Sequence, residues 1–399
     1  MTQKEFFLFL LLFFINPPIA IVVMTMWGMR LEKNRKSTTS FLILFGIMCC
    51  VFVSLINMEI VTSKAVDLKR YVDSYLIAGK YDLATYLLVG PDKLVESYKE
   101  PLFYCIVWIM NRLFVGNEQL FKFSISLLEY SLFVSALIYL GLNIKLRLNV
   151  IMSGIVIMCF FPLIFTNSLN IIRQTLANAV LLYVMIRHFF YHKRQWLAII
   201  AMPFIHTSAA LFIPLLLMPG FGKPFKKSWI WFVGVTLLIL FFQVLAQLML
   251  GLDFLNKETP ASAALERASA GALGDYNFSL FSFLVVLTIF IFSIFIFAGK
   301  LIPSTQELRR LMSVLIVLCI FVISNFQQDQ LAIRFYHYVQ SFIPIIFMIL
   351  FQTKKVSNSF LFTFSLLTII MFSIYLHIGY WTFDVTMGGW VTPLIGYAI

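Results

Sequence analysis

The sequence FSLFSFLVVLTIFIFSIFIFAG, residues 278–299, contains no charged residue. A helix needs about 20 mostly apolar residues to cross the hydrocarbon core of a bilayer, so this run predicts a transmembrane helix. The rest of the chain has a similar composition: 61% of its 399 residues are hydrophobic and only 12% are charged. Soluble proteins carry about 25% charged residues and cannot bury this much apolar surface. Lipid is therefore the predicted environment.

Nine further runs are long and apolar enough to span: 6–28, 41–61, 120–141, 149–167, 171–190, 228–251, 309–325, 335–352 and 358–380. Two other runs are irregular. The run 101–115 is short, and the run 196–219 is interrupted by Pro203, His206 and Pro214. We predict an all-α fold, a polytopic membrane helical bundle of about 10–12 transmembrane helices. It forms a single transmembrane domain over 1–399, with about ten full spans and two elements that enter the bilayer partway.

The net charge of +12 is distributed as short basic clusters between the apolar runs. This positive-inside pattern is typical of membrane proteins and argues against nucleic-acid binding. It places both termini outside the cytoplasm and leaves two external loops, 62–100 and 252–277. The N-terminal apolar run has no small-residue cleavage site after it and is predicted to be a retained first helix. The five cysteines all lie inside apolar runs without metal-ligand spacing, so we predict no metal and no cofactor.

Charged and polar groups near membrane depth are costly, and they mark candidate functional sites. One cluster is Asn170, Arg173 and Gln174, at the start of a predicted span. Arg173 is either an interfacial arginine that extends to the membrane surface or part of an anion site, because arginine binds phosphate with two parallel hydrogen bonds. Asn170 and Gln174 are one turn apart and are expected to share a face, which favours the anion site.

Arg334, Tyr336 and His337 open another predicted span. They form either an aromatic belt at the interface or a second cationic group, and two arginines facing one outer cavity would grip a pyrophosphate.

The two irregular runs carry His206 and Glu100. Broken helices at membrane depth are tolerated only where they line a cavity or are buried in protein. His206 is either a packed core histidine or a proton-transfer group. Glu100, directly before Pro101, is either a charged residue near a helix N-terminus or a catalytic carboxylate. Asp67, Arg70 and Tyr71 form a charge cluster that is either a solvated loop or a substrate contact.

The order of these motifs resembles the Wzy-type, EpsG-like polymerases of bacterial surface polysaccharides. It runs through Asp67-Leu-x-Arg70-Tyr71, Glu100-Pro101, Asn170-x-x-Arg173-Gln174 and His206-Thr-Ser-Ala. The resemblance covers residues 60–215 by motif and the rest by hydropathy and length. It implies a GT-C-like, multi-span glycosyltransferase in the bacterial inner membrane. Such an enzyme transfers a glycan from undecaprenyl pyrophosphate onto a new lipid-linked repeat unit at the periplasmic face, without a metal or nucleotide sugar.

The resemblance also implies roles for the candidate residues. Arg173 and Arg334 would stabilise the leaving pyrophosphate, and Glu100 or His206 would be the base, with Glu100 favoured. The substrate-binding set is Asp67, Arg70, Tyr71, Asn170, Gln174, Arg334, Tyr336 and His337. The partners are the lipid-linked oligosaccharide, membrane lipid and a chain-length regulator. Three alternatives remain: an O-antigen ligase, a flippase or transporter of lipid-linked oligosaccharide, and a structural membrane subunit.

Overall fold

The computed structural model describes residues 3–28, 31, 35–60, 66–88, 100–193, 195–217, 279–326 and 329–378. Every regular element within these ranges is helical. Several of the helices are apolar and long enough to cross a membrane. The predicted all-α, polytopic membrane bundle is therefore confirmed.

The chain divides into two compact units, each described here by itself: Met1–Ala210 with Phe347–Ile399, and Leu211–Ile346. The predicted single transmembrane domain stays a prediction. The helices of the first unit are α1 (Gln3–Ile15), α2 (Pro17–Gly28), α3 (Arg35–Glu59), α4 (Val66–Ala78), α5 (Leu83–Leu88), α6 (Pro101–Phe114), α7 (Glu118–Asn143), α8 (Leu148–Phe160), α9 (Pro162–Asn170), α10 (Ile172–Tyr191), α11 (Trp196–Ile205) and α20 (Asn358–Ile378).

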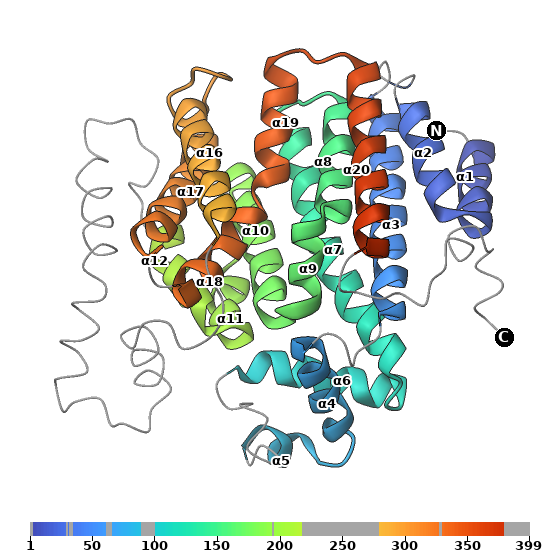
Figure 1. Ribbon diagram of the computed structural model, residues 1–399, viewed down its shortest axis with the longest axis vertical. Coiled ribbons are helices and arrows are strands. Elements are labelled where there is room, and N and C mark those ends of the chain that lie inside the picture. Colours follow the sequence, from blue (N-terminus) through green and yellow to red (C-terminus); the bar gives the residue numbers. More distant parts are fainter. Residues whose placement is uncertain are drawn as a thin grey trace. The chain divides into compact units, whose positions relative to one another are not determined.

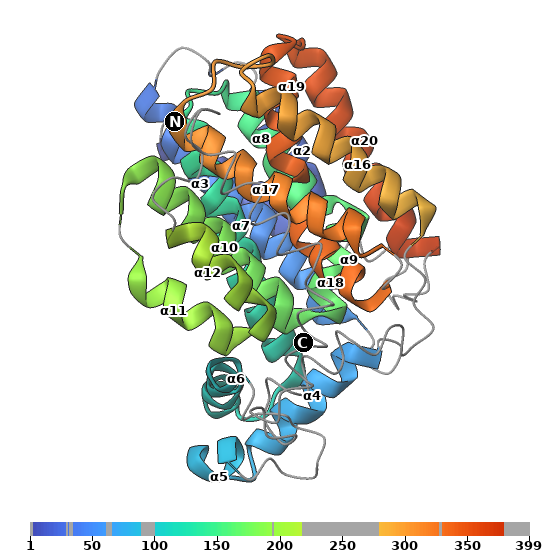
Figure 2. The ribbon, with the colours of Figure 1, turned by 90° about the vertical axis from the view of Figure 1, so that its left-hand side faces the viewer.

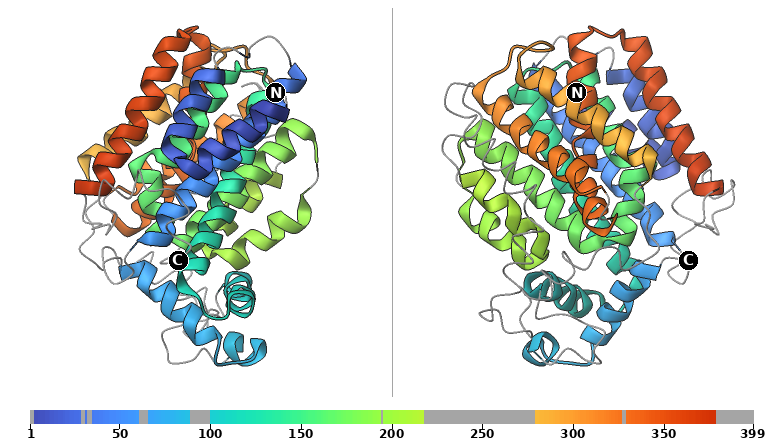
Figure 3. Two further views of the ribbon diagram at one scale, coloured as in Figure 1. Left: turned by 90° about the vertical axis from the view of Figure 1, so that its right-hand side faces the viewer. Right: turned by 60° about the vertical axis from the view of Figure 1, so that its left-hand side comes forward.

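The second unit contains α12 (Phe212–Leu217), α16 (Leu280–Phe297), α17 (Gln306–Ser324) and α18 (Asp329–Gln340). Figure 3 shows α16 and α17, both orange, side by side. The 3-10 helix η3 (Thr207–Leu211) and α19 (Ile343–Thr353) cross the boundaries between the units.

The core of the first unit is formed by α3, α7, α8, α10 and α20, which pack along one another (Figure 1). Two glycines allow close approaches between these helices. A Cβ at Gly46 of α3 would lie 2.7 Å from a side-chain carbon of Val134 in α7, and one at Gly141 of α7 would lie 2.5 Å from Ile151 in α8. Small residues at helix crossings are the usual way for membrane helices to gain close van der Waals contact.

Four unbroken helices are apolar and long enough to span: Thr39–Glu59, Glu118–Asn143, Leu280–Phe297 and Asn358–Leu376. Two bent pairs raise the count to six in the described ranges. They are Leu148–Phe160 with Pro162–Asn170, bent by 46°, and Ala332–Gln340 with Ile343–Thr353, bent by 41°. The predicted runs 171–190 and 309–325 form α10 and α17, which are not among these six, and the run 228–251 lies outside the described residues.

The predicted span over 6–28 is wrong as a single helix, because the chain breaks at Asn16. Pro17 is the first residue of α2. Proline has no N–H, but the first N–H groups of a helix have no intrahelical acceptor, so no hydrogen bond is lost. The Asn16 side chain accepts a hydrogen bond from Ile19 N–H at 3.1 Å and caps the new helix. The two short helices fold back on each other, with the rings of Phe9 and Trp27 6.0 Å apart.

The predicted external loop 62–100 is not loop throughout, because it contains α4 and α5. The pattern along α4 is amphipathic: Leu68, Val72 and Tyr75 are buried, whereas Lys69 and Asp73 are exposed. This three- and four-residue spacing of apolar positions is that of a helix with one packed face. The other predicted loop, 252–277, lies outside the described residues.

Helices α4, α5 and α6 lie together at one end of the first unit (Figures 1 and 2). Two contacts, one to α6 and one to α7, fix the position of α4. The buried Asn111 side chain of α6 donates to the Tyr75 carbonyl oxygen at 2.7 Å. The Tyr75 ring stacks on Phe121 of α7 with centroids 4.4 Å apart. The run 101–115 is confirmed as a short helix, and the run 196–219 is confirmed as broken, at His206. These two irregular elements position the candidate site.

Candidate active site

Glu100 directly precedes α6, and its side chain is buried. Pro101 occupies the first helical position, as proline commonly does. An N-cap side chain normally accepts a hydrogen bond from its own helix, but Glu100 makes no such bond. Its carboxylate interacts with side chains and backbone of other elements instead. A simple role at the helix N-terminus therefore does not account for its position.

Arg173 is the second residue of α10, and its guanidinium forms an ion pair with Glu100. The Nη1–Oε2 distance is 2.6 Å, and the Arg173 side chain is only 18% exposed. Nε donates to the Tyr71 hydroxyl at 3.3 Å and Nη1 to the Tyr104 hydroxyl at 3.4 Å. Arg173 also lies over both rings, 5.5 Å from Tyr71 and 5.9 Å from Tyr104. An arginine held by three residues in this way does not behave as a side chain that merely extends to the membrane surface.

His206 follows the last residue of α11 in an extended conformation, with φ −154° and ψ 125°. Pro203 lies inside α11 and has no N–H to donate to the carbonyl group one turn earlier, which weakens the helix shortly before it ends at Ile205. The break aims His206 Nδ1 at Glu100 Oε1, with which it forms a hydrogen bond. The backbone N–H of Thr207 donates to the same oxygen at 3.2 Å. His206 is thus hydrogen-bonded, as a core histidine would be, but its partner is a buried carboxylate.

We call Tyr71, Glu100, Tyr104, Arg173 and His206 the Glu100 cluster. Burial alone would raise the pKa of Glu100, but the charges of His206 and Arg173 and the hydrogen bonds it accepts outweigh this effect and lower the pKa to about 2. The carboxylate is therefore ionised at neutral pH and lies between the Arg173 guanidinium and the His206 ring. In the described ranges no group of three or more His, Cys, Asp or Glu side chains is placed to hold a metal ion.

The sequence matches the family model of the EpsG family over residues 42–388, a range that contains the whole Glu100 cluster. The chain belongs to the EpsG family. The predicted resemblance is thereby confirmed, and the family indicates a polysaccharide polymerase-like membrane protein. No curated protein and no solved structure matches the chain.

The EpsG-family chain brings together all three residues that the sequence nominated as catalytic: Glu100, Arg173 and His206. Tyr71, predicted to bind substrate, contacts Arg173. Its neighbour Arg70 is exposed on α4. Asp67 lies in the first turn of α4, and its side chain is outside the described residues.

Asn170 and Gln174 were expected to share one helix face, and that expectation is wrong. Asn170 ends α9 and Gln174 belongs to α10, because Ile171 between them is not helical, with φ −124° and ψ 49°. The one-turn spacing argument applies only within a continuous helix. Gln174 is buried, whereas Asn170 is half-buried.

Arg334, Tyr336 and His337 lie in α18, in the second unit of this EpsG-family protein. Arg334 is exposed, Tyr336 is buried and His337 is half-buried. Their predicted part in the same site as Arg173 stays a prediction.

Two groups of the site were not predicted from the sequence: Tyr104 and the backbone N–H of Thr207. A signal for Tyr104 was present, because it lies four residues after Glu100 along α6, and residues at this spacing are neighbours on a helix. No comparable signal existed for Thr207, whose contact uses the main chain and depends on the break at His206.

The low pKa of Glu100 predicts a pH dependence of stability. Because its folded-state pKa of about 2 lies below the ordinary value of 4.5, its contribution is complete above pH 4.5 and is lost as the pH falls toward 2. We expect the thermal unfolding midpoint of the purified protein to fall in this window relative to Glu100→Gln, which has no such titration. A constant difference between the two proteins from pH 7 to pH 3 would contradict the assignment.

Proposed function

We propose that this protein is a repeat-unit polymerase of the bacterial inner membrane. It transfers a glycan from undecaprenyl pyrophosphate onto a new lipid-linked oligosaccharide at the periplasmic face, using neither a metal nor a nucleotide sugar. The observation that carries the proposal is the Glu100 carboxylate held between His206 and Arg173. This arrangement provides a base and a fixed cation within one site.

His206, rather than Glu100, is the base in this proposal. A carboxylate with a pKa of about 2 is a weak proton acceptor at neutral pH. Glu100 instead holds the Nδ1–H tautomer of His206 and orients the ring, which leaves Nε2 to accept a proton. Nε2 makes no hydrogen bond within the described part of the chain. The proposal therefore differs from the sequence-based preference for Glu100 as base: His206 is the base, and Glu100 orients it.

The reaction balances as a substitution at the sugar. The acceptor hydroxyl gives its proton to His206 Nε2, and its oxygen forms the new glycosidic bond to the anomeric carbon. The bond from that carbon to the pyrophosphate oxygen breaks, and undecaprenyl pyrophosphate leaves with the electron pair. Arg173 is suited to stabilise this charge, because its bonds to Glu100, Tyr71 and Tyr104 use three of its five N–H donors. The donors on Nη2 make no bond within the described residues.

The other nominated residues have binding roles in this proposal. Tyr71 presents a ring to the substrate, and Asp67 and Arg70 precede it on the same helix. Asn170, Gln174, Arg334, Tyr336 and His337 remain candidates for contacts with sugar and pyrophosphate. A chain-length regulator is the proposed protein partner.

Reconstitution tests the proposal directly. Purified protein in vesicles that contain the host's lipid-linked repeat unit is expected to produce a ladder of longer lipid-linked glycans. Movement of the repeat unit across the vesicle membrane without any lengthening would favour a flippase and refute the polymerase. In a deletion strain, a polymerase predicts single repeats still attached to the lipid core, whereas complete loss of attached repeats would indicate a ligase.

A further inference from the structure

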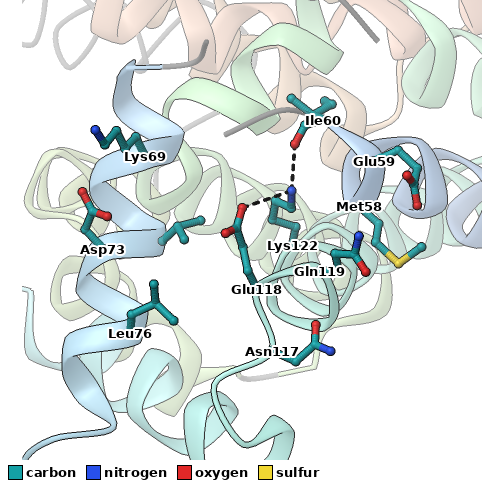
Figure 4. A pocket seen from close by; sticks show the side chains of 11 residues that line it. Met58, Glu59, Ile60, Lys69, Asp73, Leu76, Asn117, Glu118, Gln119 and Lys122 are labelled. Carbon is teal, nitrogen blue, oxygen red and sulfur yellow. Dashed lines mark hydrogen bonds and ion pairs between the residues drawn. The ribbon is translucent and has the colours of Figure 1, made fainter. Parts of the chain in front are cut away.

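A cleft lined by both charged and apolar side chains lies on the side of α4 away from the Glu100 cluster. It has a volume of about 780 Å³ and lies between α4, the end of α3 and the start of α7 (Figure 4). Its charged lining residues are Glu59, Lys69, Asp73, Glu118 and Lys122. The size is in the range of small-molecule sites, which is about 300–1,000 Å³.

The floor of the cleft contains a buried, paired lysine. Lys122 is only 4% exposed, and its ammonium donates to the Ile60 carbonyl oxygen at 2.7 Å. It also forms an ion pair with Glu118 at 3.3 Å, as the dashed lines in Figure 4 show. Burial of a lysine next to a cleft requires such fixed partners, because an unpaired ammonium is costly to remove from water. The polar groups around Lys122 are therefore held in place before any ligand arrives.

The lining chemistry selects the class of ligand. Carboxylates only accept hydrogen bonds and ammonium groups only donate them, whereas a hydroxyl group does both. Glu59, Asp73 and Glu118 oppose Lys69 and Lys122, which leaves the charged lining with one net negative charge. The net negative charge of the lining would repel a pyrophosphate. A neutral, hydroxyl-rich sugar would be able to form hydrogen bonds with both the donors and the acceptors of the lining.

The cleft and the Glu100 cluster lie on different sides of helix α4. Tyr71 contacts Arg173 on one side of α4, whereas Asp73 lines the cleft. Residues two apart on a helix do not face each other. The two sites are thus separated by the body of one helix, which is about 10 Å across.

We propose that this cleft holds a sugar residue of the substrate glycan at a distance from the bond that is formed. The inference rests on the proposed transfer reaction and adds to it a subsite for a neutral, hydroxyl-rich saccharide. Binding there recognises the repeat unit through a sugar that does not react.

The test fills the cleft without disturbing the core. Leu76 lines the cleft and is 44% exposed, so Leu76→Trp adds bulk where no packing is lost. Leu120 in the first turn of α7 is 41% exposed and does not line the cleft, so Leu120→Trp is the matched control. The probe is the oligosaccharide released from the host's lipid-linked repeat unit by mild acid, and its affinity for the purified full-length protein is measured.

We expect Leu76→Trp to weaken binding of this oligosaccharide at least tenfold and Leu120→Trp to leave it unchanged. Asp73→Ala, which removes an exposed acceptor, should weaken it about tenfold. Equal affinity of Leu76→Trp and wild type, or no binding to wild type, overturns the inference. Binding that is sensitive to Leu76→Trp without any glycan ladder would leave the saccharide site standing and refute the polymerase. A glycan ladder together with oligosaccharide binding that Leu76→Trp does not change would support the polymerase and refute the saccharide site.

Discussion

Replacing His206 by glutamine is expected to lower the initial rate of glycan transfer by about 10²–10⁴-fold, the usual contribution of a positioned general base. Glutamine keeps a polar group beside Glu100 but has no nitrogen that accepts a proton near neutral pH. The measurement is the rate at which purified protein in vesicles extends lipid-linked repeats. Wild-type rates in His206→Gln would show that Nε2 is not the base.

Thr207→Ala is the matched control for His206. Thr207 contacts Glu100 Oε1 through its backbone N–H, which the substitution retains. We therefore expect Thr207→Ala to extend repeats at nearly the wild-type rate. A loss as large as that of His206→Gln would mean that the break after α11, rather than the imidazole, is what the reaction requires.

Replacing Arg173 by lysine is expected to lower the same rate by about 10²–10³-fold, the range measured when one preorganised donor to a developing oxyanion is removed. Lysine keeps the positive charge beside Glu100, so the carboxylate stays paired. It lacks the planar guanidinium, which contacts Glu100, Tyr71 and Tyr104 and keeps two further N–H donors for phosphate. The loss should therefore appear in transfer rate more than in thermal stability.

Two further variants separate charge from geometry at Arg173. Arg173→Ala leaves one cationic partner fewer for a buried carboxylate, and breaking a buried ion pair costs about 3–5 kcal/mol, so its unfolding midpoint should drop. Arg187, on the same helix, lies 4.6 Å from the Tyr139 ring and outside the Glu100 cluster. Arg187→Lys is expected to keep full activity. Full activity of Arg173→Lys would exclude the guanidinium geometry as the cause.

Part of the fold followed from local sequence. The runs 41–61, 120–141, 278–299 and 358–380 became α3, α7, α16 and α20, because continuous apolar runs have few alternatives to a spanning helix. The break at Asn16 had a signal in the two prolines that follow, but hydropathy concealed it. Helix α4 was taken as loop because its buried face depends on α6 and α7, to which Tyr75 binds.

The site followed a similar division. Glu100 and His206 were nominated because they interrupt apolar runs, and Arg173 because it begins a predicted span. Each of these residues also had a purely structural interpretation, and no local sequence pattern decided between that interpretation and a functional one. The contact that joins Glu100 and His206 links residues 106 positions apart in the chain, so no local pattern shows it.

The sequence by itself determined that this is a helical membrane protein of the EpsG family, because composition, charge placement and motif order are local properties of the chain. Only the tertiary structure decided that Glu100, Arg173 and His206 form one cluster, in which the Glu100 carboxylate is paired with both other side chains. The physical reason is that the state of a buried charge depends on its partners. Those partners come from α10 and from the end of α11, which only folding brings beside α6.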